Sequence, residues 1–176
     1  MTPNEITMDP LVARDAGLIF FGSRDFLLAW ELLEQRHQDH EVRVGRAPWP
    51  MRAWATCAAL SLELALKARL RLEGKQPKWV HTYSELFSDL SVQAKEDIAS
   101  RVQIDGRPVT IDGLLALLKD CDGTFEQWRY LHEQLVRFEI TTFHGDRIVA
   151  ITRAIHASIV QLRRDFDQWP GVMSNR

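Results

Sequence analysis

The segment from Ser61 to Leu70 places one acidic and one basic side chain in otherwise apolar surroundings. Glu63 precedes Lys67 by four residues, so on a helix the two side chains share a face in the order that favours an ion pair. The leucines around the pair predict a helix at the centre of a bundle. An acid and a base in such a place either form an ion pair that fixes the packing of the helices or line a binding site for a ligand.

Composition excludes several classes of protein. At 176 residues the chain fits one domain, residues 1–176, with a core large enough to need no disulfides. A net charge of −2 gives no overall basic field, so non-specific binding to duplex nucleic acid is not expected. Cys57 and Cys121 are interpreted as buried free thiols. No apolar run approaches the roughly 18 residues that span a bilayer, and no signal peptide is visible, so we expect no membrane contact and a cytoplasmic location.

Hydrophobic periodicity and turn residues divide the chain into helices joined by short loops. The expected helices are Pro10 to about His37, Met51 to Glu73, a short one after Thr82, Val92 to Val102, Ile111 to Cys121, one opening at Thr124, and a last one from about Ile148 to Phe166. A turn is expected at Asp105 to Pro108, and the stretch Val136 to Phe143 fits either an extended link or a continued helix. The sequence therefore predicts an all-α bundle of four to six helices.

Some helix ends and one helix interior carry more specific expectations. Thr82 and Thr124 are each followed three residues later by Glu or Gln, which is the spacing of a capping box. Gly17 and Gly22 leave open a break of the first helix near Ser23.

Three motifs follow one another along the chain. They are Ser-x-Glu-x-x-x-Lys-Ala at Ser61, Glu63, Lys67 and Ala68, a helix led by His81, and Trp-Arg-Tyr-x-x-Glu at Trp128, Arg129, Tyr130 and Glu133. Their order resembles HEPN-domain proteins, a family of helical domains associated with nucleotides and RNA. The resemblance covers about residues 50–168 and marks the chain as a divergent member. It implies an up-and-down helical bundle, often a homodimer, in toxin–antitoxin or defence systems, with a nucleotidyltransferase as a partner protein.

Many HEPN members are metal-independent ribonucleases with an Arg-x(4–6)-His motif, whereas others lack the motif and act as binding or scaffold modules. Arg137 and His144 fit this spacing, with six residues between them, while His132 lies too close to Arg129. The resemblance implies that histidine and arginine act on the ribose 2′-hydroxyl and the scissile phosphate, roles that suit their chemistry. Phe138 departs from the pattern, because active members usually carry a small polar residue there.

A nucleotide or phosphate pocket is a second implication of the resemblance. In the family arrangement, the helical face shared by Arg129 and Glu133 approaches Glu63 and Lys67. Positive charge and stacking surfaces would then meet at one site, formed by Glu63, Lys67, His81, Trp128, Arg129, Tyr130 and Glu133. The competing interpretation is a charge network that only fixes helix register. No glycine-rich phosphate loop and no metal-ligand spacing occur, so neither a metal nor another cofactor is expected.

Together these features lead us to expect a HEPN-like binding or regulatory module that forms a homodimer and contacts a nucleotide or RNA. A metal-independent ribonuclease toxin and a purely structural interaction domain are the two alternatives. Trp49 and Trp79, which lie beside prolines, are expected either to cover the ends of the bundle or to belong to a dimer or partner surface.

Overall fold

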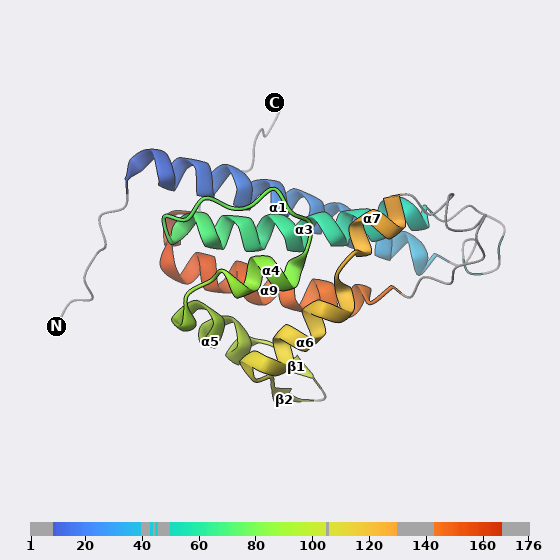
Figure 1. The fold of residues 1–176 in the computed structure, drawn as a ribbon. Coiled ribbons are helices and arrows are strands. Elements are labelled where there is room, and N and C mark those ends of the chain that lie inside the picture. Colours follow the sequence, from blue (N-terminus) through green and yellow to red (C-terminus); the bar gives the residue numbers. More distant parts are fainter. Residues whose placement is uncertain are drawn as a thin grey trace, which may run out of the picture.

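The computed structural model of the chain describes residues 9–39, 43, 45, 50–104, 106–129 and 143–166. The fold is an all-α helical bundle with one short β-hairpin (Figure 1). In chain order the elements are α1 (Pro10–His37), α3 (Met51–Leu72), α4 (Tyr83–Ser88), α5 (Val92–Arg101), β1 (Gln103–Ile104), β2 (Arg107–Pro108), α6 (Ile111–Cys121), α7 (Thr124–Arg129), α9 (Gly145–Leu162) and the 3-10 helix η1 (Arg164–Phe166).

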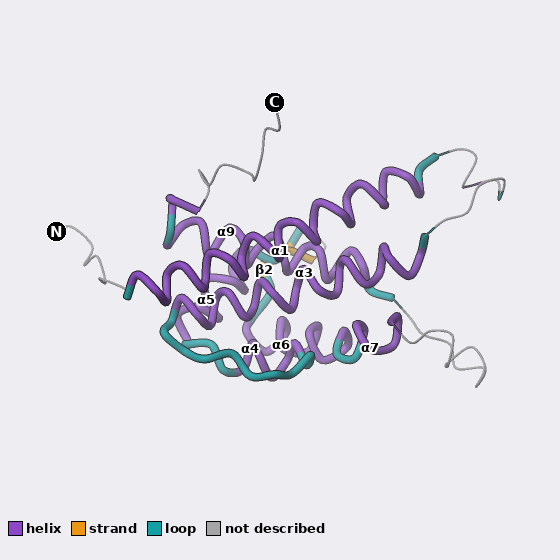
Figure 2. The backbone as a smooth tube through the Cα atoms, turned by 90° about the horizontal axis from the view of Figure 1, so that it is seen from above, coloured by secondary structure: helices purple, strands orange, loops and turns teal. Residues whose placement is uncertain are grey.

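Helix α3 occupies the centre of the bundle, as the leucine-rich segment predicts. It contacts α1, α4, α7 and α9, and α1 and α3 run side by side (Figure 2). Alanines at its contact faces are fully buried and allow neighbouring helices to approach closely; they are Ala55, Ala58, Ala59, Ala65 and Ala68. Both charged residues of the central pair therefore stand on a helix that has neighbouring helices on several sides.

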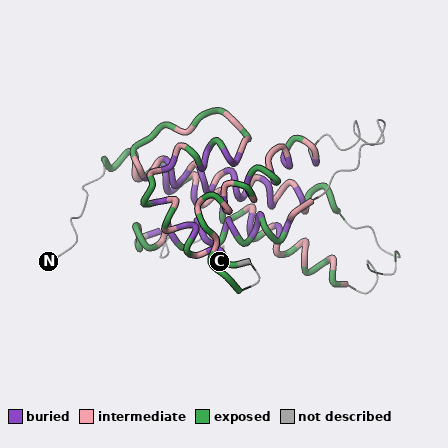
Figure 3. Tube along the Cα trace, turned by 60° about the horizontal axis from the view of Figure 1, so that its bottom comes forward, coloured by how far each residue is buried: buried purple, intermediate pink, exposed green. Residues whose placement is uncertain are grey.

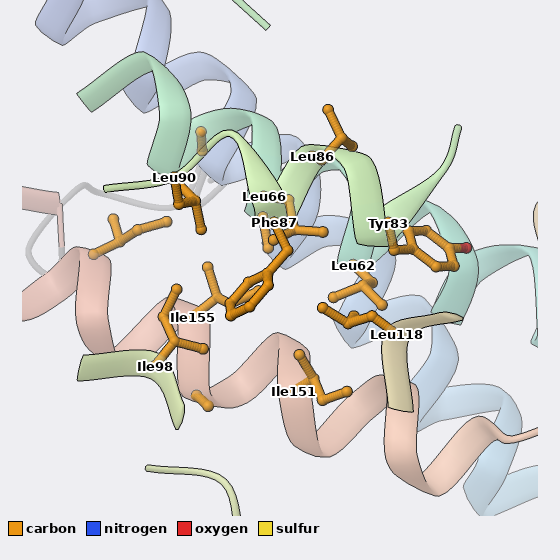
Figure 4. Close-up of a cluster of buried hydrophobic side chains, with 14 of the residues drawn as sticks. Leu62, Leu66, Tyr83, Leu86, Phe87, Leu90, Ile98, Leu118, Ile151 and Ile155 are labelled. Atoms are coloured by element: carbon orange, nitrogen blue, oxygen red, sulfur yellow. The ribbon is translucent and has the colours of Figure 1, made fainter. Parts of the chain in front are cut away.

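The apolar core joins the central helix to α4, α5, α6 and α9. Figure 4 shows large aliphatic and aromatic side chains of this core. They are Leu62, Leu66, Tyr83, Leu86, Phe87, Leu90, Ile98, Leu118, Ile151 and Ile155. Buried residues recur along the helices at intervals (Figure 3), which is the expected result of a 3.6-residue period.

Several helix starts agree with the sequence. The side chain of Asp9 accepts a hydrogen bond from the Leu11 amide at 2.9 Å, with Pro10 at the first helical position. Thr110 caps α6 by accepting from the Gly113 amide at 3.1 Å. Local residues therefore determine where these two helices begin.

The two expected capping boxes are corrected by the structure. Thr82 precedes α4, but its side chain makes no capping hydrogen bond. Instead the carboxylate of Asp122, at the end of α6, accepts from the backbone amide of Ser84 at 3.1 Å and from its hydroxyl at 2.5 Å. Thr124 is the first residue of α7 rather than its cap, and its hydroxyl donates to the carbonyl of Cys121.

Helix α1 continues without a break through Ser23. Its glycines serve close packing instead, because a Cβ at Gly17 would lie 3.4 Å from the ring of Phe166, and one at Gly22 would lie 3.4 Å from Leu64. The expected turn near Gly106 is a hairpin in which the glycine adopts φ 75°. The last helix ends at Leu162, so Phe166 belongs to η1.

Within the described residues, no helix is long and apolar enough to cross a membrane. The stretch 136–142, for which the sequence left two conformations open, lies outside the described residues.

Candidate functional site

The structure brings together three of the expected site residues: Glu63, Lys67 and His81. The ammonium of Lys67 donates to Oε1 of Glu63 at 2.6 Å, as the four-residue spacing predicts. Nδ1 of His81 lies 2.8 Å from the other carboxylate oxygen, Oε2. One carboxylate thus holds two basic side chains, one from its own helix and one from the loop that precedes α4.

Burial differs sharply among the three side chains. The side chain of Glu63 is 5% exposed and that of Lys67 is 15% exposed, whereas that of His81 is 45% exposed. Because Nδ1 faces the carboxylate, Nε2 is the ring nitrogen left for other partners, and no residue in the described part of the chain bonds to it. Glu63 therefore fixes the imidazole of His81 through Nδ1, while the partly exposed ring keeps Nε2 for a contact outside the described fold.

Aromatic side chains enclose the same region. The ring of His81 lies against Phe125 of α7, with centroids 5.0 Å apart and the planes tilted by 33°. Tyr83 is fully buried behind the carboxylate and donates its hydroxyl proton to the carbonyl of Ala59 at 3.2 Å. Burial, reinforced by the negative charge of Glu63, holds the pKa of Tyr83 well above its usual value, so this phenol stays neutral and structural.

Trp128 of α7 packs against a different part of α3 from the part that carries Glu63. It is 6% exposed and packs on Ala55, with Phe143 at 5.4 Å between ring centroids. Ala55 precedes Glu63 by eight residues, which is about 12 Å along a helix axis. In the described part of the chain, no acceptor reaches the buried indole nitrogen of Trp128. The ring of Trp128 therefore packs about two helical turns away from the level of Glu63.

The remaining expected ligand residues are not described at the level of side chains. Arg129 ends α7, and only its backbone is described. Tyr130 and Glu133 lie outside the described residues, so the four-member charge cluster stays a prediction.

The expected catalytic pair is also incomplete, because Arg137 lies outside the described residues. His144 is half-buried at the N-terminal end of α9, where its backbone carbonyl accepts from the Ile148 amide at 3.0 Å. The adjacent Phe143 packs on Trp54, near the start of α3, with ring centroids 4.5 Å apart. His144 therefore belongs to the same end of α3 as Trp128, and His81 belongs to its middle.

Trp79 was expected to cover an end of the bundle or to belong to a dimer or partner surface. It is 97% exposed, so it does not cover an end of the bundle, and the partner surface stays a prediction. Trp79 stands two residues before His81 in the same loop. Flanking lysine and proline residues were the available signal for an open position, whereas Phe125 carried only the signal of a core residue. Trp49 lies outside the described residues.

A second polar cluster, which the sequence did not reveal, is fully paired. Arg69 binds Glu73 at 3.2 Å and donates to the hydroxyl of Ser158 at 3.3 Å. Burial raises the pKa of Glu73, but hydrogen bonds from Lys75 and Ser91 and the charge of Arg69 outweigh it and lower the pKa below its usual value. These groups satisfy one another, so the cluster is a structural tie between helices.

A buried serine–histidine contact links α1, α3 and α9. The hydroxyl of Ser23 donates to the carbonyl of Ser61 at 2.6 Å, so Nε2 of His156, 2.7 Å away, must donate to Ser23. Burial, with the charge of Arg24, lowers the pKa of His156 to about 4. Ser23 has no solvent exposure and its proton is already committed, so the contact is structural and not a nucleophile with its base.

The thiols and carboxylates offer no other reactive centre in the described region. Burial raises the pKa of Cys121 to about 11, which keeps this thiol protonated. Within the described residues, no group of three or more histidine, cysteine, aspartate or glutamate side chains is arranged to hold a metal ion.

Comparison of the chain with family models, with curated proteins and with solved structures gave no match. The functional argument therefore depends on the geometry around Glu63.

Proposed function

We propose that this chain is a HEPN-like helical module that binds a phosphate-bearing ligand, a nucleotide or RNA, at the exposed edge of His81 beside Lys67. The observation that carries the proposal is that the Glu63 carboxylate contacts two basic side chains, Lys67 and His81. Lys67 alone supplies one positive charge to this buried carboxylate, and yet the carboxylate also fixes a second, half-exposed basic group. A group held in this way is oriented before any ligand arrives, which lowers the entropy cost of binding.

The chemistry of the proposed site suits an anion. A protonated imidazole held at Nδ1 offers its Nε2–H to a phosphate oxygen, and such charge-assisted hydrogen bonds are stronger than neutral ones. The ammonium of Lys67 has three donors, of which Glu63 uses one. Phosphate recognition by two basic groups agrees with a chain whose net charge of −2 rules out a general basic surface.

The fully exposed Trp79 offers a stacking surface for the base. Exposed indole rings stack on nucleobases with little sequence preference, and such contacts support binding to single-stranded nucleic acid. Trp79 replaces Trp128 in this role, since Trp128 is buried at another level of α3. The proposed ligand is therefore a nucleotide or a single-stranded RNA segment.

Binding is preferred over cleavage because the contacts of Lys67 and His81 with Glu63 support a binding site, whereas Arg137 of the expected catalytic pair lies outside the described residues. A homodimer and a nucleotidyltransferase partner remain predictions of the resemblance. An RNA-cleavage assay in excess EDTA tests the ribonuclease alternative, and cutting that requires Arg137 and His144 would replace our proposal with that activity.

Isothermal titration calorimetry with AMP, ATP and a short single-stranded RNA tests the binding proposal. We expect His81→Ala to weaken binding by about tenfold or more, the usual value of one charge-assisted hydrogen bond. We expect Trp79→Ala to weaken RNA binding selectively. Arg107→Ala is the matched control, because Arg107 is an exposed cation on β2, and it should leave the affinity unchanged. Equal affinities of wild type and the His81 variant would contradict the proposal.

A further inference from the structure

Helix α1 presents an apolar face to solvent. Four of its leucines are more than half exposed: Leu11, Leu18, Leu28 and Leu32. The helix packs against α3 through its opposite face, which carries the buried residues Ala16, Phe20, Leu27 and Trp30. Single exposed leucines are ordinary on protein surfaces, but a stripe of them along one helix indicates a contact surface.

The outward stripe has the spacing of a coiled-coil seam. Steps of three and four residues separate its members, which are Leu11, Arg14, Leu18, Phe21, Asp25, Leu28 and Leu32. Five of these seven positions are apolar, as the a and d positions of a heptad require. Phe21 is half-buried against Phe166, with ring centroids 6.0 Å apart, and forms part of the same outer surface.

The two charged members of the stripe decide what can pair with it. Arg14 and Asp25 have opposite charges and lie at equal distances from the midpoint between Ile19 and Phe20. In an antiparallel pair of α1 helices centred at that midpoint, Arg14 faces the partner's Asp25 and Leu18 faces the partner's Phe21. Leu11 then faces the partner's Leu28, so every layer is either apolar or charge-matched.

Other pairings of the same helix are unfavourable. A parallel pair in register would place Arg14 against the partner's Arg14, and Asp25 against the partner's Asp25. Antiparallel registers displaced by one heptad would set Asp25 or Arg14 against an apolar side chain, which leaves a charge unpaired in the seam. The charges therefore select one arrangement with two-fold symmetry.

Both charges are available for such a contact. Arg14 and Asp25 are exposed, and within the described part of the chain neither has an ion-pair partner. The neighbouring Asp15 differs, because it binds Arg71 of α3 at 2.9 Å. Within the described residues, Arg14 and Asp25 on the seam thus form no ion pair in the fold, whereas Asp15 beside the seam does.

We propose that α1 binds α1 of a second copy of this chain, antiparallel, through the stripe from Leu11 to Leu28, with Arg14 paired to the partner's Asp25. This proposal does not depend on ligand binding at His81, and it assigns a surface and an orientation to the homodimer that the sequence led us to expect.

A charge swap tests the pairing directly. Sedimentation equilibrium of the full chain, over a hundredfold range of concentration, measures the dimer dissociation constant of wild type, Arg14→Asp, Asp25→Arg and the double variant. Each single reversal creates two like-charge contacts, so we expect each to weaken the dimer by about tenfold or more. In the double variant each ion pair forms again with its two charges exchanged. Its dissociation constant should lie within about threefold of the wild-type value.

Arg107→Asp is the control for net charge, because it lies on the hairpin at the opposite side of the bundle from α1 (Figure 1). It should leave the dissociation constant unchanged, and circular dichroism should show that every variant is folded. A wild-type chain that stays monomeric overturns the proposal. So does a dimer that ignores both single reversals, or a double variant that dissociates as readily as the single variants.

Discussion

At the scale of single residues, Glu63 is the group whose environment most constrains its neighbours. Its carboxylate is almost fully buried and bonds to both Lys67 and His81. Burial of an ion costs several kcal/mol, and the partner charges offset this cost only while they remain in place. The contribution of this cluster to the free energy of unfolding can therefore be measured by removing its side chains one at a time.

We expect Lys67→Met to lower the free energy of unfolding by about 3–5 kcal/mol, because it leaves a buried carboxylate without its main counter-charge. The double variant Glu63→Leu/Lys67→Met removes both charges and should recover most of that loss. Urea unfolding measures both changes. Arg153→Met breaks an exposed ion pair with Glu31 and should cost less than about 1 kcal/mol. Similar small losses in all three variants would show that Glu63 is solvated.

His156 gives the fold a pH dependence of its own. Its pKa in the folded state is about 4, lowered by burial and by Arg24, against about 6.5 in an unfolded chain. Between these values the unfolded state binds more protons, so this contribution is complete above about pH 6.5 and declines as the pH falls toward 4. At about 1.4 kcal/mol per pH unit, the loss across this window is about 3 kcal/mol.

Urea unfolding at a series of pH values should show this decline in wild type but not in His156→Gln, whose amide can still donate to Ser23. The carboxylates Glu73 and Asp97, whose folded-state pKa values are lowered, lose their stabilising contributions as the pH falls below their usual values of 4.5 and 3.8. Both carboxylates are present in wild type and in the variant, so the difference between the two pH profiles measures His156. Identical pH profiles of wild type and the variant would contradict the assignment.

At the scale of elements, α4 shows that a helix can be capped from a distance. The expected cap, Thr82, makes no side-chain bond, while Asp122 bonds to both the amide and the hydroxyl of Ser84. The six-residue helix α4 therefore depends on the end of α6 for its start. Helices of this length have no stability of their own, so tertiary contacts decide whether they form.

We expect Asp122→Ala to destabilise the protein by about 1–2 kcal/mol, the usual cost of losing an N-cap. Thr82→Ala should cost less than about 0.5 kcal/mol, since its hydroxyl caps nothing. Thermal and urea unfolding of the two variants compare them directly. A larger loss for Thr82→Ala than for Asp122→Ala would restore the local capping box.

Helices whose ends and faces are determined locally could be predicted from the sequence. The start of α1 follows from Asp9 and Pro10, and the centrality of α3 follows from its leucines. The cap from Asp122 could not be predicted, because the two partners are separated by 38 residues. The continuity of α1 at its glycines was open for the same reason, since Phe166 and Leu64 fill the space beside them.

In the candidate site, too, only a contact between residues close in sequence could be predicted from spacing. Spacing on one helix revealed the ion pair of Glu63 and Lys67, but only the resemblance added His81. The two tryptophans differ in exposure, because Trp128 is buried and Trp79 is fully exposed. Of the two placements expected for Trp79, the cover of a bundle end is therefore wrong. The side chains of Arg129, Tyr130 and Glu133 lie outside the description.

At the scale of the whole molecule, the bundle separates two surfaces. The proposed ligand site lies where α3, the loop before α4 and α7 meet, whereas the proposed dimer seam lies on the face of α1 turned away from α3. The central helix α3, much of which is buried, lies between them. Because the two surfaces share no residues, a variant of one can be tested without altering the other.

The most direct test of the central claim is a long-range ¹H–¹⁵N correlation spectrum of the six histidine rings during titration with a short single-stranded RNA. His81→Gln identifies the His81 signals. We predict that Nε2 of His81 shifts progressively and saturates, that its Nδ1 keeps the hydrogen bond to Glu63, and that His156 does not move. A His81 ring that stays unchanged at saturating RNA, or a response confined to His144, would contradict the account.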